Sequence, residues 1–277
     1  MDKIISSILH SEVNLAKSVH DDFQLYTGVL SDSFNIKPSH DTYATLSIVH
    51  ESVFLLNNFC HNAFYLQDEA LNNYQTVSIH LLNRAVVCSL QGDTELSSFA
   101  LRGSLEAAGS QSALLNTKPP LPKFSNNLEA NVSEFKQEIL TRADLRTNTL
   151  NKHNYPLIKK RTLKNSFNNF TAFGRETLYG NLSEIIHVRA PQSNQLSSTL
   201  IDIANQISFA DASASSLNLI SETAIYELMM LQLNIKILEE RRIPASLQEY
   251  IIQYFTVHPI GCTESFLNLW KTSMVFL

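Results

Sequence analysis

Four polar side chains suited to acid–base or anion-binding chemistry recur every four residues in one short segment. Arg175, Tyr179, Ser183 and His187 stand at i, i+4, i+8 and i+12, a spacing that stacks side chains on one face of a helix. His187 titrates near neutral pH and can act as a base, an acid or a ligand. Alternatively, His187 is a core or cleft-edge histidine that bonds to a neighbouring helix. The stripe therefore predicts either the edge of a cleft or a buried hydrogen-bond network.

A second candidate group lies on an earlier, apolar helix. Arg102 and Glu106 are spaced i, i+4. Such a pair is either a surface ion pair or a half-buried pair that lines a cleft. Because both groups flank apolar stripes that must face one core, we expect this pair to meet Tyr179 and His187 across two packed helices.

The elements that must position these residues are all predicted to be helices. Apolar residues recur at three–four spacing along most of the chain, and Asp93 or Thr94 can cap the helix that carries Arg102. The chain holds only 7 Gly and 8 Pro, too few for the many tight turns of a sheet-rich fold. The sequence therefore predicts an all-α, antiparallel multi-helix bundle. The other expected helices cover 2–30, 42–68, 70–91, 128–150, 156–170, 194–212, 215–241 and 245–256, with a loop at 31–41 and a stop to the stripe segment at Pro191.

The clearest break in the chain is residues 116–127, which hold Pro119, Pro120 and Pro122. Proline ends helices, so this segment is either a linker between two domains or a crossover within one bundle. We favour a single domain, in which the N-terminal helices of residues 1–115 pack with the C-terminal helices of 128–277.

Composition and charge restrict the class of protein. The 277 residues are 44% apolar with a formal net charge of -5, so we expect a globular chain without the global basic field of non-specific nucleic-acid binders. The densest basic run includes Lys159 and Lys160. It is either a solvated face or a local nucleic-acid patch, and in the second case both lysines are candidate binding residues.

Targeting and redox signals point to the cytoplasm. The three cysteines are far apart and lack metal or redox spacing, as expected for reduced thiols. We find no signal peptide and no run of 18 apolar residues, so no membrane span is expected.

Several catalytic motifs are missing. The sequence has no Gly-rich phosphate loop, no His-Glu-x-x-His and no Gly-x-Ser-x-Gly, which disfavours NTPases, zincins and α/β-hydrolases. Histidines such as His50, His61 and His80 are frequent near the N-terminus. The Glu-x-x-His pairs of bundle metal sites do not recur, however, and we expect no metal and no cofactor.

Two stretches together resemble a known group of proteins. They are Leu101-Arg102-Gly-Ser-Leu-Glu106, preceded by Leu81-Leu-Asn-Arg-Ala-Val-Val, and Leu178-Tyr179-Gly-Asn-Leu-Ser183-Glu-Ile-Ile-His187. This order is similar to that of uncharacterised bacterial helical proteins, which are in turn similar to the HEPN superfamily of toxin and phage-defence domains. The resemblance covers about residues 45–235. It implies a HEPN-like core with added helices.

The same resemblance implies a function, because many HEPN domains are metal-independent ribonucleases. It implies that Arg102, Glu106, Tyr179 and His187 line a catalytic cleft, with Ser183 and Arg175 as binding residues beside it. Arginine would then hold a phosphate and histidine would act as acid or base. RNA, a protein partner or a second copy of the chain are the expected partners.

One departure from the HEPN pattern leaves two functions open. HEPN ribonucleases carry an Arg-x(4–6)-His motif on one helix, but the window before His187 holds no arginine. Arg175 is about 18 Å away along a helix, and we interpret the matching pair Arg146 and His153 as chance. The chain is then either an effector of a defence or toxin system that cleaves RNA, or a catalytically silent helical module for binding or oligomerisation.

Overall fold

The computed structural model describes residues 2–64, 69–115, 120–121, 124, 126–128, 160–186, 210–237 and 244–275. In these ranges the chain forms helices and short connections, and no β-strand occurs. The predicted all-α, multi-helix fold is confirmed there. The helix predicted at 128–150 and most of the one at 194–212 lie outside the described residues.

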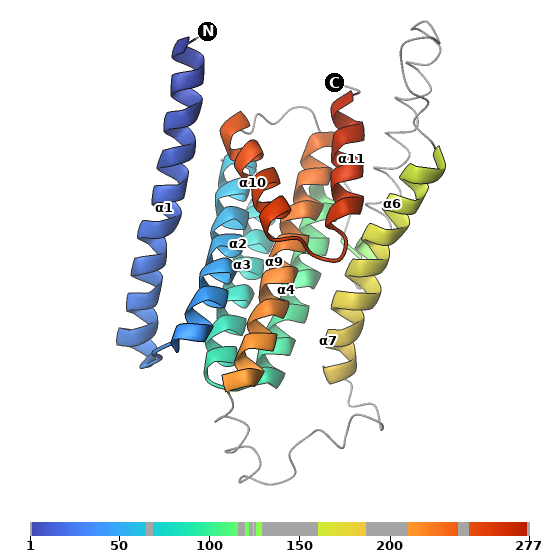
Figure 1. The fold of residues 1–277 in the computed structure, drawn as a ribbon. Coiled ribbons are helices and arrows are strands. Elements are labelled where there is room, and N and C mark those ends of the chain that lie inside the picture. Colours follow the sequence, from blue (N-terminus) through green and yellow to red (C-terminus); the bar gives the residue numbers. More distant parts are fainter. Residues whose placement is uncertain are drawn as a thin grey trace, which may run out of the picture.

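Four long helices pack into a central bundle. They are α2 (His40–Phe64), α3 (Glu69–Leu90), α4 (Thr94–Leu115) and α9 (Ala210–Ile237), and they lie side by side in Figure 1. α3 packs most extensively on α4, and α9 contacts α2, α3 and α4. Each carries apolar residues at helical spacing, so each buries a stripe against the others.

The turn between α3 and α4 follows local rules. Gly92 has φ 81°, the left-handed conformation that glycine adopts without strain and that commonly ends a helix. The Asp93 amide bonds to the Cys88 carbonyl at 2.8 Å, and its carboxylate accepts the Leu96 amide at 2.9 Å. Asp93 is therefore the cap of α4, and this turn makes α3 and α4 an antiparallel hairpin.

α1 (Asp2–Phe34) stands at one side of the bundle, where it packs against α2 and α10 (Ala245–Val257). The loop predicted at 31–41 is shorter than expected, because α1 continues to Phe34 and α2 already starts at His40. Asn35 ends α1 with φ 54°, a left-handed conformation that asparagine tolerates better than most residues.

The opposite side of the bundle carries four shorter elements. α6 (Lys160–Ala172) packs on α11 (Thr263–Val275), and α7 (Tyr179–Ile186) packs on α4. The residues between α6 and α7 form η1 (Phe173–Leu178), a π-helical turn in which the Tyr179 amide bonds to the Gly174 carbonyl five residues back. The predicted stripe segment is therefore not one uninterrupted α-helix.

A close contact accompanies this π turn. A Cβ added to Gly174 would overlap the ring of Tyr226, which lies in α9 and stacks on Phe170 at 4.8 Å. Glycine is needed at this position because even a single Cβ atom does not fit between η1 and α9. π turns of this kind are frequent at functional sites.

One hydrophobic core extends through all these elements. It runs from Phe23 in α1 to Trp270 in α11 and joins residues of both halves of the chain. α9 is continuous from Ala210 to Ile237, so the break expected between 212 and 215 is absent. The residues at 212–215 are alanines and serines, which are small and compatible with a helix, so the chain has no helix breaker there. None of the described helices is long and apolar enough to cross a membrane.

Candidate functional site

The structure brings Arg102, Glu106 and Tyr179 together between α4 and the start of α7. Arg102 Nη2 donates to the Tyr179 hydroxyl at 3.1 Å, and Arg102 Nε donates to Glu106 Oε1 at 3.3 Å. The Tyr179 hydroxyl donates to the same carboxylate oxygen at 2.8 Å. Three of the four residues expected to converge across two helices therefore form one closed triad.

Tyr179 is held in place by contacts on its ring. Phe124 stacks on it at a centroid distance of 5.2 Å, and the Arg102 guanidinium lies 5.1 Å from the ring centroid, within the range of a cation–π contact. Burial, together with the bond to Glu106, raises the pKa of Tyr179. The hydroxyl thus stays protonated near neutral pH, where it bridges the cation and the carboxylate.

The other predicted site residues divide into two groups. Arg175 bonds to the neighbouring Glu176 at 2.6 Å on an exposed part of η1, and the Ser183 hydroxyl is buried with no hydrogen-bond partner among the described residues. His187 and Lys159 lie outside the described residues, as does the side chain of Lys160 at the start of α6. The approach of Arg102 to His187 therefore stays a prediction.

A buried carboxyl group sits at the centre of the bundle. Glu227 of α9 is fully buried, and its oxygens accept the hydroxyl of Ser78 at 2.6 Å and of Ser104 at 2.7 Å. Burial raises the pKa of Glu227 to about 7, although the two serine bonds act in the opposite direction. This group is enclosed by α3 and α4, so it affects stability rather than contacting a ligand from solvent.

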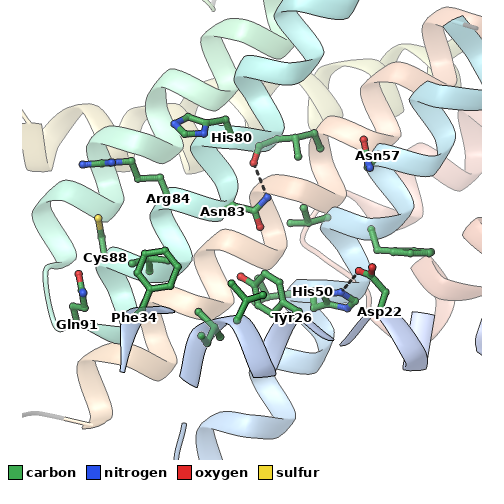
Figure 2. A pocket seen from close by; sticks show the side chains of 17 residues that line it. Asp22, Tyr26, Phe34, His50, Asn57, His80, Asn83, Arg84, Cys88 and Gln91 are labelled. Atoms are coloured by element: carbon green, nitrogen blue, oxygen red, sulfur yellow. Dashed lines mark hydrogen bonds and ion pairs between the residues drawn. The ribbon is translucent and has the colours of Figure 1, made fainter. Parts of the chain in front are cut away.

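A groove outside the predicted site is a second candidate binding place among the described residues. It has a volume of about 680 Å³ and is lined by residues from positions 22–34 of α1, 49–57 of α2 and 79–88 of α3, together with Gln91 just after α3; we call it the α1–α3 groove. In Figure 2, Asp22 and Asn57 lie toward one end of the groove and Phe34 toward the other. Each helix contributes side chains at three–four spacing, so the groove follows the direction of the helices.

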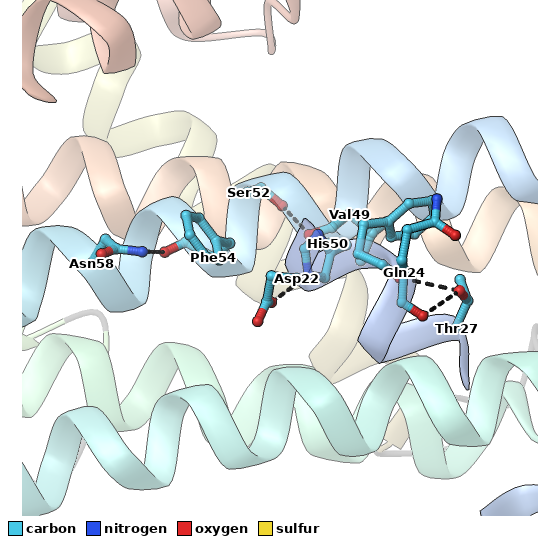
Figure 3. Close-up of polar contacts among 9 residues, drawn as sticks. Asp22, Gln24, Thr27, Val49, His50, Ser52, Phe54 and Asn58 are labelled. Carbon is cyan, nitrogen blue, oxygen red and sulfur yellow. Dashed lines mark hydrogen bonds and ion pairs between the residues drawn. The ribbon is translucent and has the colours of Figure 1, made fainter. Parts of the chain in front are cut away.

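The wall formed by α1 and α2 contains a buried histidine. His50 is only 5% exposed, and its Nε2 donates to the Asp22 carboxylate at 2.8 Å. In the neutral ring Nδ1 is then an acceptor, and it finds no donor among the described residues. Figure 3 shows this bond as the link between the two helices, beside the bonds that Thr27 and Ser52 make within their own helices.

The wall formed by α3 carries positive charge. His80 and Arg84 are exposed and spaced i, i+4, so they lie on the same face of α3. Neither makes an ion pair with another described residue. Tyr26, on the facing side of the groove, also has a hydroxyl that bonds to no described residue. Polar groups with free bonding capacity thus surround an apolar floor.

The sequence contained a partial signal for this groove. His50 and His80 belong to the histidine-rich N-terminal part of the chain, where the sequence pattern disfavours a metal site. Within the described residues, no group of three or more His, Cys, Asp or Glu side chains is placed to hold a metal ion. The two histidines instead line one groove from different helices.

Comparison of the chain with protein families, curated proteins and solved structures finds no match. Function is therefore inferred from the side chains themselves.

Proposed function

We propose that this chain is a binding module that holds a small, largely apolar molecule in the α1–α3 groove. The observation that carries the proposal is the groove itself. Its volume of about 680 Å³ falls within the roughly 300–1,000 Å³ of typical small-molecule sites, which combine apolar walls with a few polar groups. Val49, Val53 and Leu30 supply the apolar wall, and His50 and Arg84 are among the polar groups.

Exposed apolar side chains at the groove support this proposal. Val29 and Phe34 line it, yet they are 53% and 45% exposed. Large apolar residues grouped at a concave surface commonly mark a binding place. A bound molecule would remove them from water, and each buried CH₂ contributes about 0.8 kcal/mol.

An uncharged probe tests whether the groove binds an apolar molecule, separately from any effect of charge. Decan-1-ol, titrated by calorimetry, should bind the parent protein, and Val29→Trp should weaken binding at least about tenfold because the indole ring occupies the groove. Val77→Trp is the matched control, since Val77 is 46% exposed on α3 and does not line the groove. Equal binding to both variants, with unchanged melting temperatures, would contradict the proposal.

A second function is favoured by the triad of Arg102, Glu106 and Tyr179. We propose, as the alternative, a HEPN-like effector of a defence or toxin system in which Arg102 holds an RNA phosphate and His187 transfers protons. The contact between Arg102 and Tyr179 supports this proposal, because Tyr179 begins the segment that leads to His187.

One experiment separates this effector from a structural triad. If the effector proposal holds, the parent protein cleaves RNA and His187→Ala lowers the rate by about 10²–10⁴-fold without changing the melting temperature. If the triad is structural, no cleavage is measured, and Tyr179→Phe lowers the free energy of unfolding by about 1 kcal/mol, because one hydroxyl that bonds to both Arg102 and Glu106 is lost.

A further inference from the structure

We propose that the ligand of the α1–α3 groove is a single-chain amphiphile with an anionic oxygen head group, which Arg84 and His80 bind. This inference rests on the proposed binding function and adds the chemical class of the ligand. The shared chemistry is that of a carboxylate or a phosphate ester on a linear apolar chain.

The charges along the groove determine the sign of the head group. Asp22 is the acidic side chain that lines it, and its carboxylate is already bonded to His50 at 2.8 Å. Arg84 and His80 line the opposite wall and have no acidic partner among the described residues. A negative group would therefore meet positive charge on α3 that no described acidic side chain pairs with, whereas Asp22, the acidic side chain among the described lining residues, lies on the facing wall and already accepts a hydrogen bond from His50.

The spacing of the two basic side chains suits a compact anion. Residues four apart on a helix have neighbouring side chains, so His80 and Arg84 can contact one head group together. The planar guanidinium of arginine binds carboxylate and phosphate oxygens through two parallel hydrogen bonds. His80 adds a hydrogen-bond donor on the same face.

The remainder of the groove suits a linear chain. Its α1 wall runs from Asp22 to Phe34, which corresponds to about 18 Å at the rise of an α-helix. Between these ends the walls are mainly apolar, with Leu30, Val49 and Val53 on one side and Val87 on the other. An elongated, mainly apolar surface with a positive edge matches a chain with a charged end better than a compact apolar ring system.

Three probes with the same ten-carbon chain test the head group directly. Decanoate, decyl phosphate and decan-1-ol are titrated by calorimetry below micelle-forming concentrations. We expect at least one of the two anions to bind the parent protein about tenfold more tightly than the alcohol, since hydrogen bonds to a charged group have about this effect. The anion that binds more tightly identifies the head group as carboxylate or phosphate.

Arg84→Gln tests the residue that we assign to the head group. It should weaken binding of the preferred anion about tenfold and leave alcohol binding within about twofold. Lys164→Gln, which removes an exposed positive charge on α6 far from the groove wall, is the matched control and should change neither.

The outcomes distinguish the two proposals. If the alcohol binds as tightly as both anions, or if Arg84→Gln binds the preferred anion like the parent, the head-group inference is wrong and the binding function stands. If none of the three probes binds, the proposed function fails and this inference fails with it.

Discussion

Replacement of Gly174 by alanine is expected to lower the free energy of unfolding by about 3 kcal/mol, the upper end of the usual cost of overpacking a core. The added Cβ would overlap the Tyr226 hydroxyl and lie 2.7 Å from its Cε1. Tyr226 cannot easily move away, because it is fully buried, stacks on Phe170 and donates to the Phe170 carbonyl at 3.3 Å. Urea denaturation of the parent and the variant measures the change.

Gly28→Ala is the matched control for this substitution. Gly28 is also helical, but a Cβ added there meets nothing within 4 Å. Alanine is the better helix former by about 1 kcal/mol, so this variant should be as stable as the parent or more stable. If Gly174→Ala has the same unfolding free energy as Gly28→Ala, η1 does not pack closely on α9 at Gly174.

The stability of the protein should fall as the pH rises from about 4.5 to 7, because of Glu227. Its pKa in the folded chain is about 7, against an ordinary value of 4.5, and burial is the main cause. Below pH 4.5 the carboxyl is protonated in both states and has no pH-dependent cost. Between the two values the unfolded chain releases the proton while the folded chain keeps it, so folding loses about 1.4 kcal/mol per pH unit. Above pH 7 the loss is complete at roughly 3 kcal/mol.

Glu227→Gln isolates this contribution from those of other titrating groups. The amide resembles the protonated carboxyl and can still bond to Ser78 and Ser104. Unfolding free energies of parent and variant are compared at pH 4.5 and pH 8. The variant should gain roughly 3 kcal/mol relative to the parent over this interval. Glu249→Gln, at an exposed position on α10, is the control. Its unfolding free energy should differ from that of the parent by the same amount at pH 4.5 and at pH 8. A constant difference for Glu227→Gln would mean that Glu227 has no raised pKa.

Much of the fold follows from local patterns in the sequence. The helices α2, α3 and α10 begin and end close to the residues that apolar spacing predicted, and Asp93 caps α4 through its own carboxylate. The approach of Arg102 and Glu106 to Tyr179 was also predicted, because polar residues beside apolar stripes are positioned by the burial of those stripes.

The features that the sequence pattern does not predict depend on contacts between residues far apart in the chain. The π turn η1 accompanies the packing of Gly174 on Tyr226, which is some fifty residues away in the chain. Glu227 lies in a helix that reads as apolar, and its partners Ser78 and Ser104 come from two other helices. Helical periodicity reports which face of an element is buried, but it does not report which faces meet.

The α1–α3 groove could not be predicted for the same reason. His50 and His80 were visible as histidines in the sequence, but their common groove exists only because α1 packs on α2 and leaves space beside α3. The pairing of His50 with Asp22 spans two helices. No spacing rule within one helix gives that distance.

The location of a bound amphiphile tests the central claim most directly. Decanoate is titrated into protein labelled at the methyl groups of Ile, Leu and Val, and chemical shifts are followed by NMR. We predict that the largest shifts fall on methyls in the groove wall, among them Val29, Leu30, Val49, Val53 and Val87, while methyls of the distant α11 such as Leu269 stay unchanged. Shifts that concentrate away from the α1–α3 groove, or no shifts at all, would contradict the account.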